Sequence, residues 1–145
     1  MPYPSTQPPP VSRRLSRPEG LRLLGNVTFG RIVFISRALP GIQLVSHVMD
    51  GEDLLVGLPG DCEVVKLLTQ LSPVVYEADV LDTATRHGWS IVLTGRAGLV
   101  EDDEEIARAL RRLRPWPGEE ISVVVRIHPE LVTGTRIEDA TAAAR

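Results

Sequence analysis

Histidine and cysteine are the residues of this chain that most often bind metals, but their arrangement predicts no metal site. His47, His87 and His128 lie on three different predicted elements without the spacing of metal ligands, and Cys62 is the only cysteine. A zinc site needs at least three convergent ligands. A single cysteine also excludes a disulfide framework. We therefore expect no bound metal and no cross-link.

Three carboxylates, Glu77, Asp79 and Asp82, lie close together in the sequence and could do acid–base chemistry. Glu77 and Asp79 alternate along a predicted strand and therefore share one of its faces. The simpler interpretation is that they face solvent or pair with arginines, and we prefer it. The carboxylates alone identify no reaction.

The segment Gly88-Trp89-Ser90 begins a long predicted strand. "GWSIV" starts like the G-x-S-x-G motif of serine hydrolases, but Val92 replaces the second glycine and the chain continues as a strand. We therefore do not expect Ser90 to be a nucleophile. Alternation places Ser90 on one face of this strand and an apolar core face on the other, formed by Trp89, Ile91, Leu93, Ala97 and Leu99. Gly95 suits a bend or a close approach of another backbone.

His47 shares one face of its predicted strand with Gln43, Val45 and Met49. A half-polar face of this kind either meets solvent or lines a pocket, and the spacing leaves both possibilities open. The chain contains none of the common signatures for dinucleotides, for nucleoside triphosphates or for the zinc site of metalloproteases.

The bulk properties restrict the class of protein. The chain has 145 residues, which is enough for one domain, and only six are aromatic, so Val, Leu and Ile fill the core. A formal net charge of −3 argues against a nucleic-acid or membrane-surface binder. No apolar run approaches the roughly 18 residues of a membrane span. The N-terminus has no signal-peptide core, so we expect a cytoplasmic protein.

Turn residues and periodicity predict three parts of the chain: a disordered Pro-rich tail over 1–12, a folded domain over 13–138 and a frayed end over 139–145. The predicted strands are 30–36, 42–49, 53–58, 72–80, 86–100, 120–128 and 131–137. The predicted helices begin at the Ser16/Glu19 capping box, at an Asp61 cap and at Glu101. Their expected buried faces include Val64, Leu67, Leu68 and Leu71 in the second helix, and Ile106, Ala109, Leu110 and Leu113 in the third.

Several predicted strands are apolar on both faces, and tight turns join the early ones. We therefore expect a mainly β, α+β fold in which an antiparallel sheet closes into a small barrel with helices at its ends. An open two-layer sheet is the alternative.

Five segments, in this order and spacing, resemble the pyridoxamine 5′-phosphate oxidase-like family of flavin-binding split barrels, and its small actinobacterial branch in particular. They are "LLGNVTFGRIVF", "LPGIQLVSHVMDGEDLLV", "VVYEADVLDTATRHGWSIVLTGRAGLV", "RPWPGEEISVVVRI" and "VTGTRI". The most specific pieces are Glu77-x-Asp79, Gly88-Trp89-Ser90 with Gly95-Arg96-Ala97, and Pro115-Trp116. The resemblance runs from Leu15 to Ile137.

This resemblance implies a six-stranded antiparallel split β-barrel with short flanking helices, assembled as a homodimer. It implies FMN as the cofactor, with FAD or deazaflavin F420 as alternatives and heme as a rarer one, in clefts between the two copies. The residues it places near the cofactor are Ser46, His47, Lys66, Trp89, Ser90 and Trp116. The implied function is a flavin- or deazaflavin-dependent oxidoreductase acting on a small molecule.

One part of the chain departs from the pattern that the resemblance implies. Gly57 and Leu58 stand where flavin-binding relatives carry side-chain donors for the FMN phosphate, and Asp61 and Glu63 add negative charge. A carboxylate about 4 Å from a phosphate costs on the order of 4 kcal/mol at an effective dielectric constant near 20. Lys66 is the cation that could compensate. The alternative function is therefore a cofactor-free dimer that binds a small molecule or a protein partner.

Overall fold

The computed structural model describes residues 9–68 and 73–140 and contains a sheet that closes on itself. All strand pairs are antiparallel, in the order β1-β7-β4-β3-β2-β5-β6, and a β6–β7 pairing closes the ring. The strands are β1 Val11–Arg14, β2 Phe29–Ser36, β3 Leu39–Asp50, β4 Asp53–Leu58, β5 Pro73–Leu81, β6 Gly88–Leu99 and β7 Val123–Glu138. The helices are α1 Arg17–Leu24, α2 Glu63–Leu67 and α3 Asp103–Arg112.

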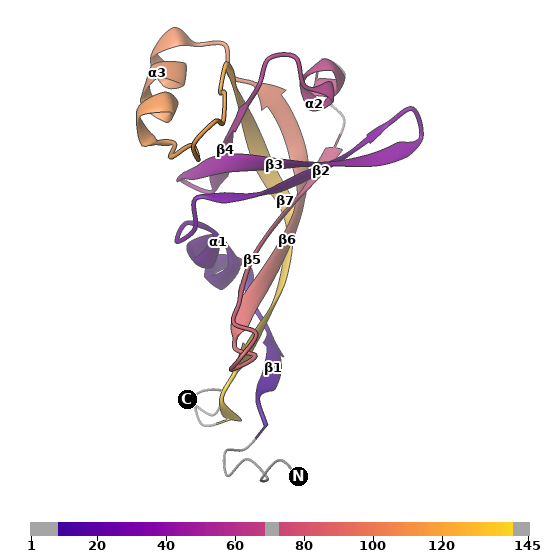
Figure 1. The fold of residues 1–145 in the computed structure, drawn as a ribbon, viewed down its shortest axis with the longest axis vertical. Helices are drawn as coiled ribbons and strands as arrows, with labels where there is room; N and C mark the ends of the chain where they lie inside the picture. The colour runs from indigo at the N-terminus through magenta and orange to yellow at the C-terminus, as the bar shows by residue number, and fades with distance from the viewer. Residues whose placement is uncertain (1–8, 69–72, 141–145) are drawn as a thin grey trace.

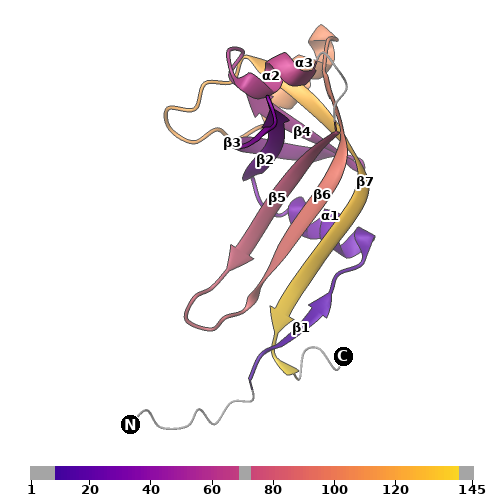
Figure 2. The same ribbon diagram turned by 90° about the vertical axis from the view of Figure 1, so that its right-hand side faces the viewer.

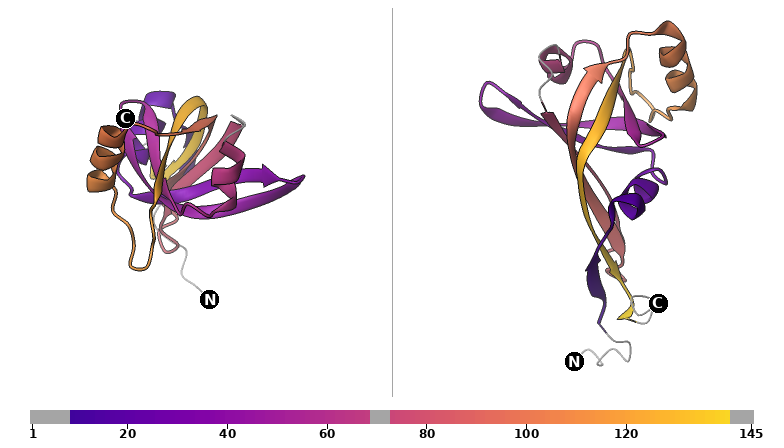
Figure 3. Two further views of the ribbon diagram at one scale, coloured as in Figure 1. Left: turned by 90° about the horizontal axis from the view of Figure 1, so that it is seen from above. Right: turned by 180° about the vertical axis from the view of Figure 1, so that it is seen from behind.

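The expected six-stranded split barrel is confirmed. β2 to β7 form the ring, and the long strands β5, β6 and β7 continue below it as a twisted ribbon (Figures 1 and 2). β1 pairs with the lower end of β7. α2 and α3 lie at the opposite end of the molecule from β1 (Figure 1). Seen from above, α3 and the β2–β3 hairpin project to opposite sides (Figure 3).

The barrel interior is filled by the residues that strand alternation placed on one face. Tyr76, Ile91 and Leu93 are almost completely buried, and Trp89 joins the same cluster. The prediction of burial is wrong for two residues: Leu99 and Leu110 are 38% and 44% exposed. Leu99 is the last residue of β6, where the sheet ends, and Leu110 lies beside the one face of α3 that packs on the barrel through Ala109.

α1 begins with the predicted capping box. Glu19 N–H donates to Ser16 Oγ at 3.3 Å and Ser16 N–H donates to Glu19 Oε1 at 3.1 Å. The helix packs against the lower part of the ring, where a Cβ added to Gly20 would lie 3.1 Å from the Val132 side chain. The residues on its inner side are therefore buried, and Leu24 is fully so.

Three predicted boundaries need correction. β1 begins inside the expected tail, because Val11 and Ser12 complete the free edge of β7 by pairing with Glu138 and Ile137. α2 is capped by Cys62 rather than Asp61 and has no side-chain cap bond. The predicted strands 120–128 and 131–137 are one strand, β7, which passes through a proline.

The proline is accommodated because β7 is irregular at that point. The register shifts between Thr94 and Gly95, so that Gly95 opposes Pro129 while Thr94 opposes Leu131. A bulge of this kind does not need the amide hydrogen that proline lacks. Gly95 has a second reason to be glycine, since a Cβ there would lie 2.3 Å from the His128 carbonyl oxygen. The close approach of another backbone expected at Gly95 is confirmed.

Residues 1–8, 69–72 and 141–145 lie outside the described part of the chain, and so do most of the expected tail, Leu71 and most of the expected C-terminal end. Within the described residues, no helix is long and apolar enough to cross a membrane.

Candidate functional site

The segment between α3 and β7, residues 113–122, crosses the outside of β3 and β4, and we call it the strap. Ser46 donates to Glu119 twice: its N–H lies 3.2 Å from Oε2, and its hydroxyl bonds Oε1. Ser122 N–H donates to Leu58 O at 3.0 Å, and Ser122 Oγ accepts from Gly60 N–H at 2.5 Å. Ser46 is consequently fully buried although it points away from the barrel core.

An aromatic pair adjoins this covered region. Phe29 and Trp116 meet edge to face, with ring centroids 6.4 Å apart and planes at 79°. Phe29 is the strand neighbour of Ser46, and Trp116 is held in a strap turn in which Glu119 N–H donates to its carbonyl oxygen at 3.0 Å. Phe29 is nevertheless 52% exposed. The pair therefore forms an apolar aromatic surface that a ligand can reach.

His47 faces the barrel interior and is 1% exposed, which decides between the two possibilities left open by its spacing. Its Nε2 lies 2.9 Å from Leu24 O, and its Nδ1 bonds the Tyr76 hydroxyl. A carbonyl oxygen only accepts, so Nε2 carries the hydrogen and Nδ1 accepts from the Tyr76 O–H. The chain Tyr76–His47–Leu24 joins β5, β3 and the end of α1.

Both ring groups of this network are held uncharged. Burial lowers the pKa of His47 below its ordinary value, partly offset by its bonds to backbone carbonyls. Burial raises the pKa of the Tyr76 hydroxyl far above its ordinary range. No buried side-chain nitrogen or oxygen of the described residues lacks a hydrogen-bond partner. His47 is therefore a neutral, fully bonded core residue.

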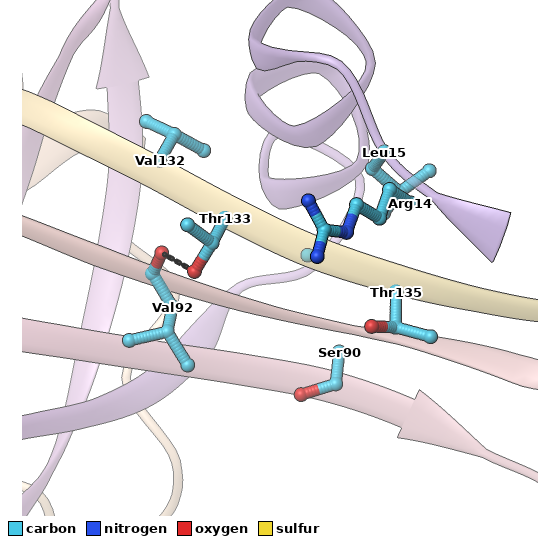
Figure 4. A pocket seen from close by; sticks show the side chains of 8 residues that line it. Arg14, Leu15, Ser90, Val92, Val132, Thr133 and Thr135 are labelled. Carbon is cyan, nitrogen blue, oxygen red and sulfur yellow. Dashed lines mark hydrogen bonds between the residues drawn. The ribbon is translucent and has the colours of Figure 1, made fainter.

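Ser90 lies on the other side of β6 from Trp89 and opens into a pocket of about 520 Å³. Figure 4 shows Ser90 beside Thr135, with the Arg14 guanidinium extending over β7 between Thr133 and Thr135. Thr133 Oγ1 donates to Val92 O at 3.4 Å. Ser90 thus faces a polar outer groove, whereas Trp89 belongs to the core.

Lys66 lies on α2, with its ammonium 3.8 Å from the Glu63 carboxylate. The six residues expected near a cofactor therefore do not form a single site. The structure brings together Ser46, His47 and Trp116, and it leaves Ser90, Trp89 and Lys66 elsewhere on the protomer.

The turn between β4 and α2 does not fit a bound phosphate. A Cβ added to Gly57 would lie 2.7 Å from the Ile121 side chain, so the strap fills the space that a side-chain donor would need. Leu58 is fully buried. The ionisable side chains around this turn are mostly acidic, namely Asp61 and Glu63. α2 has only five residues and no side-chain cap bond.

The carboxylates of β5 form ion pairs rather than a catalytic pair. Arg31 lies 2.9 Å from Glu77 and 3.8 Å from Asp79. Burial and the neighbouring Asp79 raise the pKa of Glu77, and Arg31 opposes this. The expected arginine partner is confirmed. No group of three or more potential metal ligands occurs among the described residues.

Sequence reasoning missed Glu119 and Tyr76. Glu119 lies in a loop whose sequence has no periodic pattern, so no sequence pattern indicates its hydrogen bonds to Ser46. Alternation puts Tyr76 on the face of its strand opposite Glu77 and Asp79, and a buried tyrosine needs a partner for its hydroxyl. Searching for a polar residue on a neighbouring core face could have found His47.

The architecture and the site define a split barrel with a strap over one end of β3 and β4. Comparison with known proteins then identifies the family. Residues 16–136 match the family described as pyridoxamine 5′-phosphate oxidase. The chain is 44% identical over 129 residues to the uncharacterized protein Rv0080 of Mycobacterium tuberculosis, covering 85% of this chain and 84% of that one. The protein belongs to the pyridoxamine 5′-phosphate oxidase family.

Solved structures agree with this assignment. The FAD-binding protein from Mycobacterium smegmatis superposes with a TM-score of 0.71 at 28% identity, over 86% of this chain and 98% of that one. An FAD-binding protein from Mesorhizobium loti has a TM-score of 0.72 over 90% and 99% of the two chains. Its identity of 18% shows a shared fold alone. Flavin-binding proteins are thus among the structural neighbours of this chain.

Proposed function

We propose that this protein binds a flavin and acts, as a homodimer, as an oxidoreductase on a small molecule. The observation that carries the proposal is its likeness to the FAD-binding protein of Mycobacterium smegmatis, which extends over nearly the whole of that chain at 28% identity. A bound flavin would supply the electron transfer, while the protein would supply orientation and polar contacts.

The chain offers one aromatic surface for a flavin ring. Phe29 and Trp116 form an exposed apolar pair next to Ser46, and planar aromatic ligands pack well on such rings. Ser46 could donate to a ring oxygen once Glu119 leaves it, since both of its donors now point at that carboxylate. The turn between β4 and α2 contributes no phosphate contact, so this proposal does not place FMN there.

The outer face of the barrel supports the homodimer. Residues that are paired between neighbouring strands form one row across five strands. The row consists of Ile42, Val33, Val75, Thr94 and Leu131. Ile42 and Leu131 are 69% and 60% exposed. The adjoining row carries the Arg31–Glu77 ion pair between Leu44 and Val92. An apolar patch with a polar element of this kind is typical of an interaction surface.

Titration with riboflavin, FMN and FAD, followed by the visible spectrum and by quenching of flavin fluorescence, tests the flavin. We expect saturable binding, and Trp116→Ala should weaken it while Trp116→Phe should retain most of it. A protein that is colourless as purified and gives no change with any of the three flavins would contradict the proposal.

Sedimentation equilibrium tests the dimer. We expect a dimer for the wild type and a monomer for Ile42→Lys/Leu131→Lys. The control is Leu110→Lys, which adds the same charge at an exposed leucine of α3. A monomeric wild type, or a double variant that stays dimeric, would contradict the assembly.

A second candidate function is a cofactor-free dimer that binds a small molecule. The observation favouring it is the strap itself, whose Ile121 fills the space at Gly57 and whose Glu119 takes both donors of Ser46. The same titration separates the two functions.

A further inference from the structure

Arginines gather in a cavity on the side of β3 that faces the end of α3. The cavity has a volume of about 620 Å³. Three of its ten lining residues are Arg111, Arg112 and Arg114, and none of the ten is acidic. In a chain whose net charge is −3, a cavity lined by cations without a carboxylate is a local exception.

Two of these guanidinium groups have no counter-ion within the described part of the chain. Among residues 9–68 and 73–140, neither Arg111 nor Arg114 forms an ion pair or a hydrogen bond through its side chain. Arg112 donates to Met49 O at 2.5 Å, which places it against the edge of β3.

The adjacent cavity on the same helix shows the opposite arrangement. It is lined by Asp50, Glu105, Arg108, Arg112 and Arg126, among others. There Arg126 lies 2.9 Å from Asp50, 3.1 Å from Asp53 and 3.9 Å from Glu105. The chain therefore balances its arginines with carboxylates on one side of α3 and leaves them unbalanced on the other.

Helix electrostatics explains only part of this cluster. Arg111 and Arg112 lie in the last turn of α3, where cations interact favourably with the helix dipole. Arg114 lies beyond the C-cap residue Leu113, whose backbone is already extended. The dipole therefore gives no reason for a third arginine facing the same cavity.

The opposite wall of the cavity is an open strand edge. β2 begins at Phe29, opposite Ser46, and the preceding Thr28 O accepts from His47 N–H at 2.9 Å. Beyond that point β3 pairs with β4 on one side only, and Val48 and Met49 line the cavity on the other. Thr28 adds a hydroxyl group, while His47 is held neutral by burial.

From this arrangement we propose that the cavity binds the phosphate groups of a small molecule, with Arg111 and Arg114 as the principal ligands. Guanidinium groups bind phosphate oxygens through charge-assisted, often bidentate hydrogen bonds. The ligand is a free nucleotide or the diphosphate of a flavin dinucleotide, and both share this chemistry. The second source rests on the proposed flavin function, because Arg114 lies two residues before Trp116 in the strap and the turn between β4 and α2 does not fit a phosphate.

Isothermal titration calorimetry with inorganic pyrophosphate and with ADP tests the site without any flavin. We expect saturable binding that weakens with added salt. Arg111→Gln/Arg114→Gln should lose affinity by about ten-fold or more for each guanidinium removed. Arg37→Gln, at the tip of the β2–β3 hairpin on the opposite side of the molecule, should bind like the wild type (Figure 3).

A measurement on the wild type keeps the proposal testable if the double variant does not fold. In NMR spectra, the Nε–Hε resonances of Arg111 and Arg114 should shift as pyrophosphate is added, whereas that of Arg37 should not. The proposal is overturned if the wild type binds neither pyrophosphate nor ADP, or if the folded double variant binds them as the wild type does.

Competition then identifies the source of the phosphate. Displacement of pyrophosphate by FAD indicates a flavin dinucleotide, and displacement by ADP without an effect of FAD indicates a free nucleotide. If FAD binds with equal affinity to the wild type and the double variant, the flavin function stands and a flavin diphosphate is excluded as the ligand of this cavity. If pyrophosphate binds and no flavin does, the site stands and the flavin function is refuted.

Discussion

Replacing Tyr76 by phenylalanine removes one buried hydroxyl and keeps the ring that fills the core. The hydroxyl donates to Nδ1 of His47, and the two residues are 0% and 1% exposed. In Tyr76→Phe, Nδ1 therefore stays buried as an acceptor without a donor. An orphaned buried polar group costs about 1–3 kcal/mol, so we expect the free energy of unfolding to fall by about 2 kcal/mol.

The same substitution should change the pH dependence of stability. Because the pKa of His47 is lowered in the folded state, the unfolded chain binds more protons as the pH falls below about 6.5. The stability contributed by this residue is complete above that pH. It is lost as the pH falls toward the folded pKa, by at most about 1.4 kcal/mol per pH unit. In Tyr76→Phe, Nδ1 is free to take up a proton, so the folded pKa rises and this dependence weakens.

Urea unfolding at about pH 8 and about pH 5.5 measures both effects. A double-mutant cycle with His47→Gln isolates the bond, because the glutamine amide can still donate to Leu24 O. We expect a coupling free energy of about 1–2 kcal/mol between the two positions. A loss below about 0.5 kcal/mol in Tyr76→Phe, with no coupling, would refute the assignment of this hydrogen bond.

Two further substitutions test the strap and the bulge. Glu119→Ala should speed hydrogen exchange of the Ser46 amide by at least about ten-fold, because the carboxylate that accepts from this amide is removed. Exchange at the wild-type rate would show that the strap does not protect the Ser46 amide. Gly95→Ala should destabilise the fold by about 2 kcal/mol or more, because its Cβ would overlap the His128 carbonyl oxygen. The matched control Gly98→Ala, whose Cβ would meet nothing within 4 Å on the same strand, should stay within about 0.5 kcal/mol of the wild type. Equal effects at the two glycines, measured by urea unfolding, would contradict the packing argument.

The sequence was most informative where a local pattern decides the structure. Strand alternation correctly separated Trp89, Ile91 and Leu93, which are buried, from Ser90 on the opposite face. The capping box at Ser16 and Glu19 located the start of α1 within one residue, because both partners of a cap lie within one turn. These features depend on neighbours in the chain, so one sequence is enough to predict them.

Features set by distant residues escaped prediction. The sequence predicts that a strand ends before Pro129, but β7 continues through it. The strand can include this proline because of the bulge opposite Gly95, which lies 34 positions away in the sequence. The edge strand β1 pairs with the edge of β7 that faces away from β6, and nothing in the proline-rich tail indicates this pairing. In both cases a tertiary contact decides the local structure, and such a contact produces no periodic pattern in the sequence from which it could be predicted.

The candidate site shows most clearly where local reasoning ends. Alternation predicts that only one of Ser46 and His47 can face the core, yet both are buried. His47 is covered by the barrel interior, and Ser46 is covered by the strap, whose Glu119 takes both of its donors. A ligand that hydrogen-bonds Ser46 must therefore first displace a carboxylate of the same chain. Its apparent affinity is then reduced by the fraction of molecules in which the strap is closed. The identity of residue 119 thus controls access to a serine 73 positions earlier in the chain.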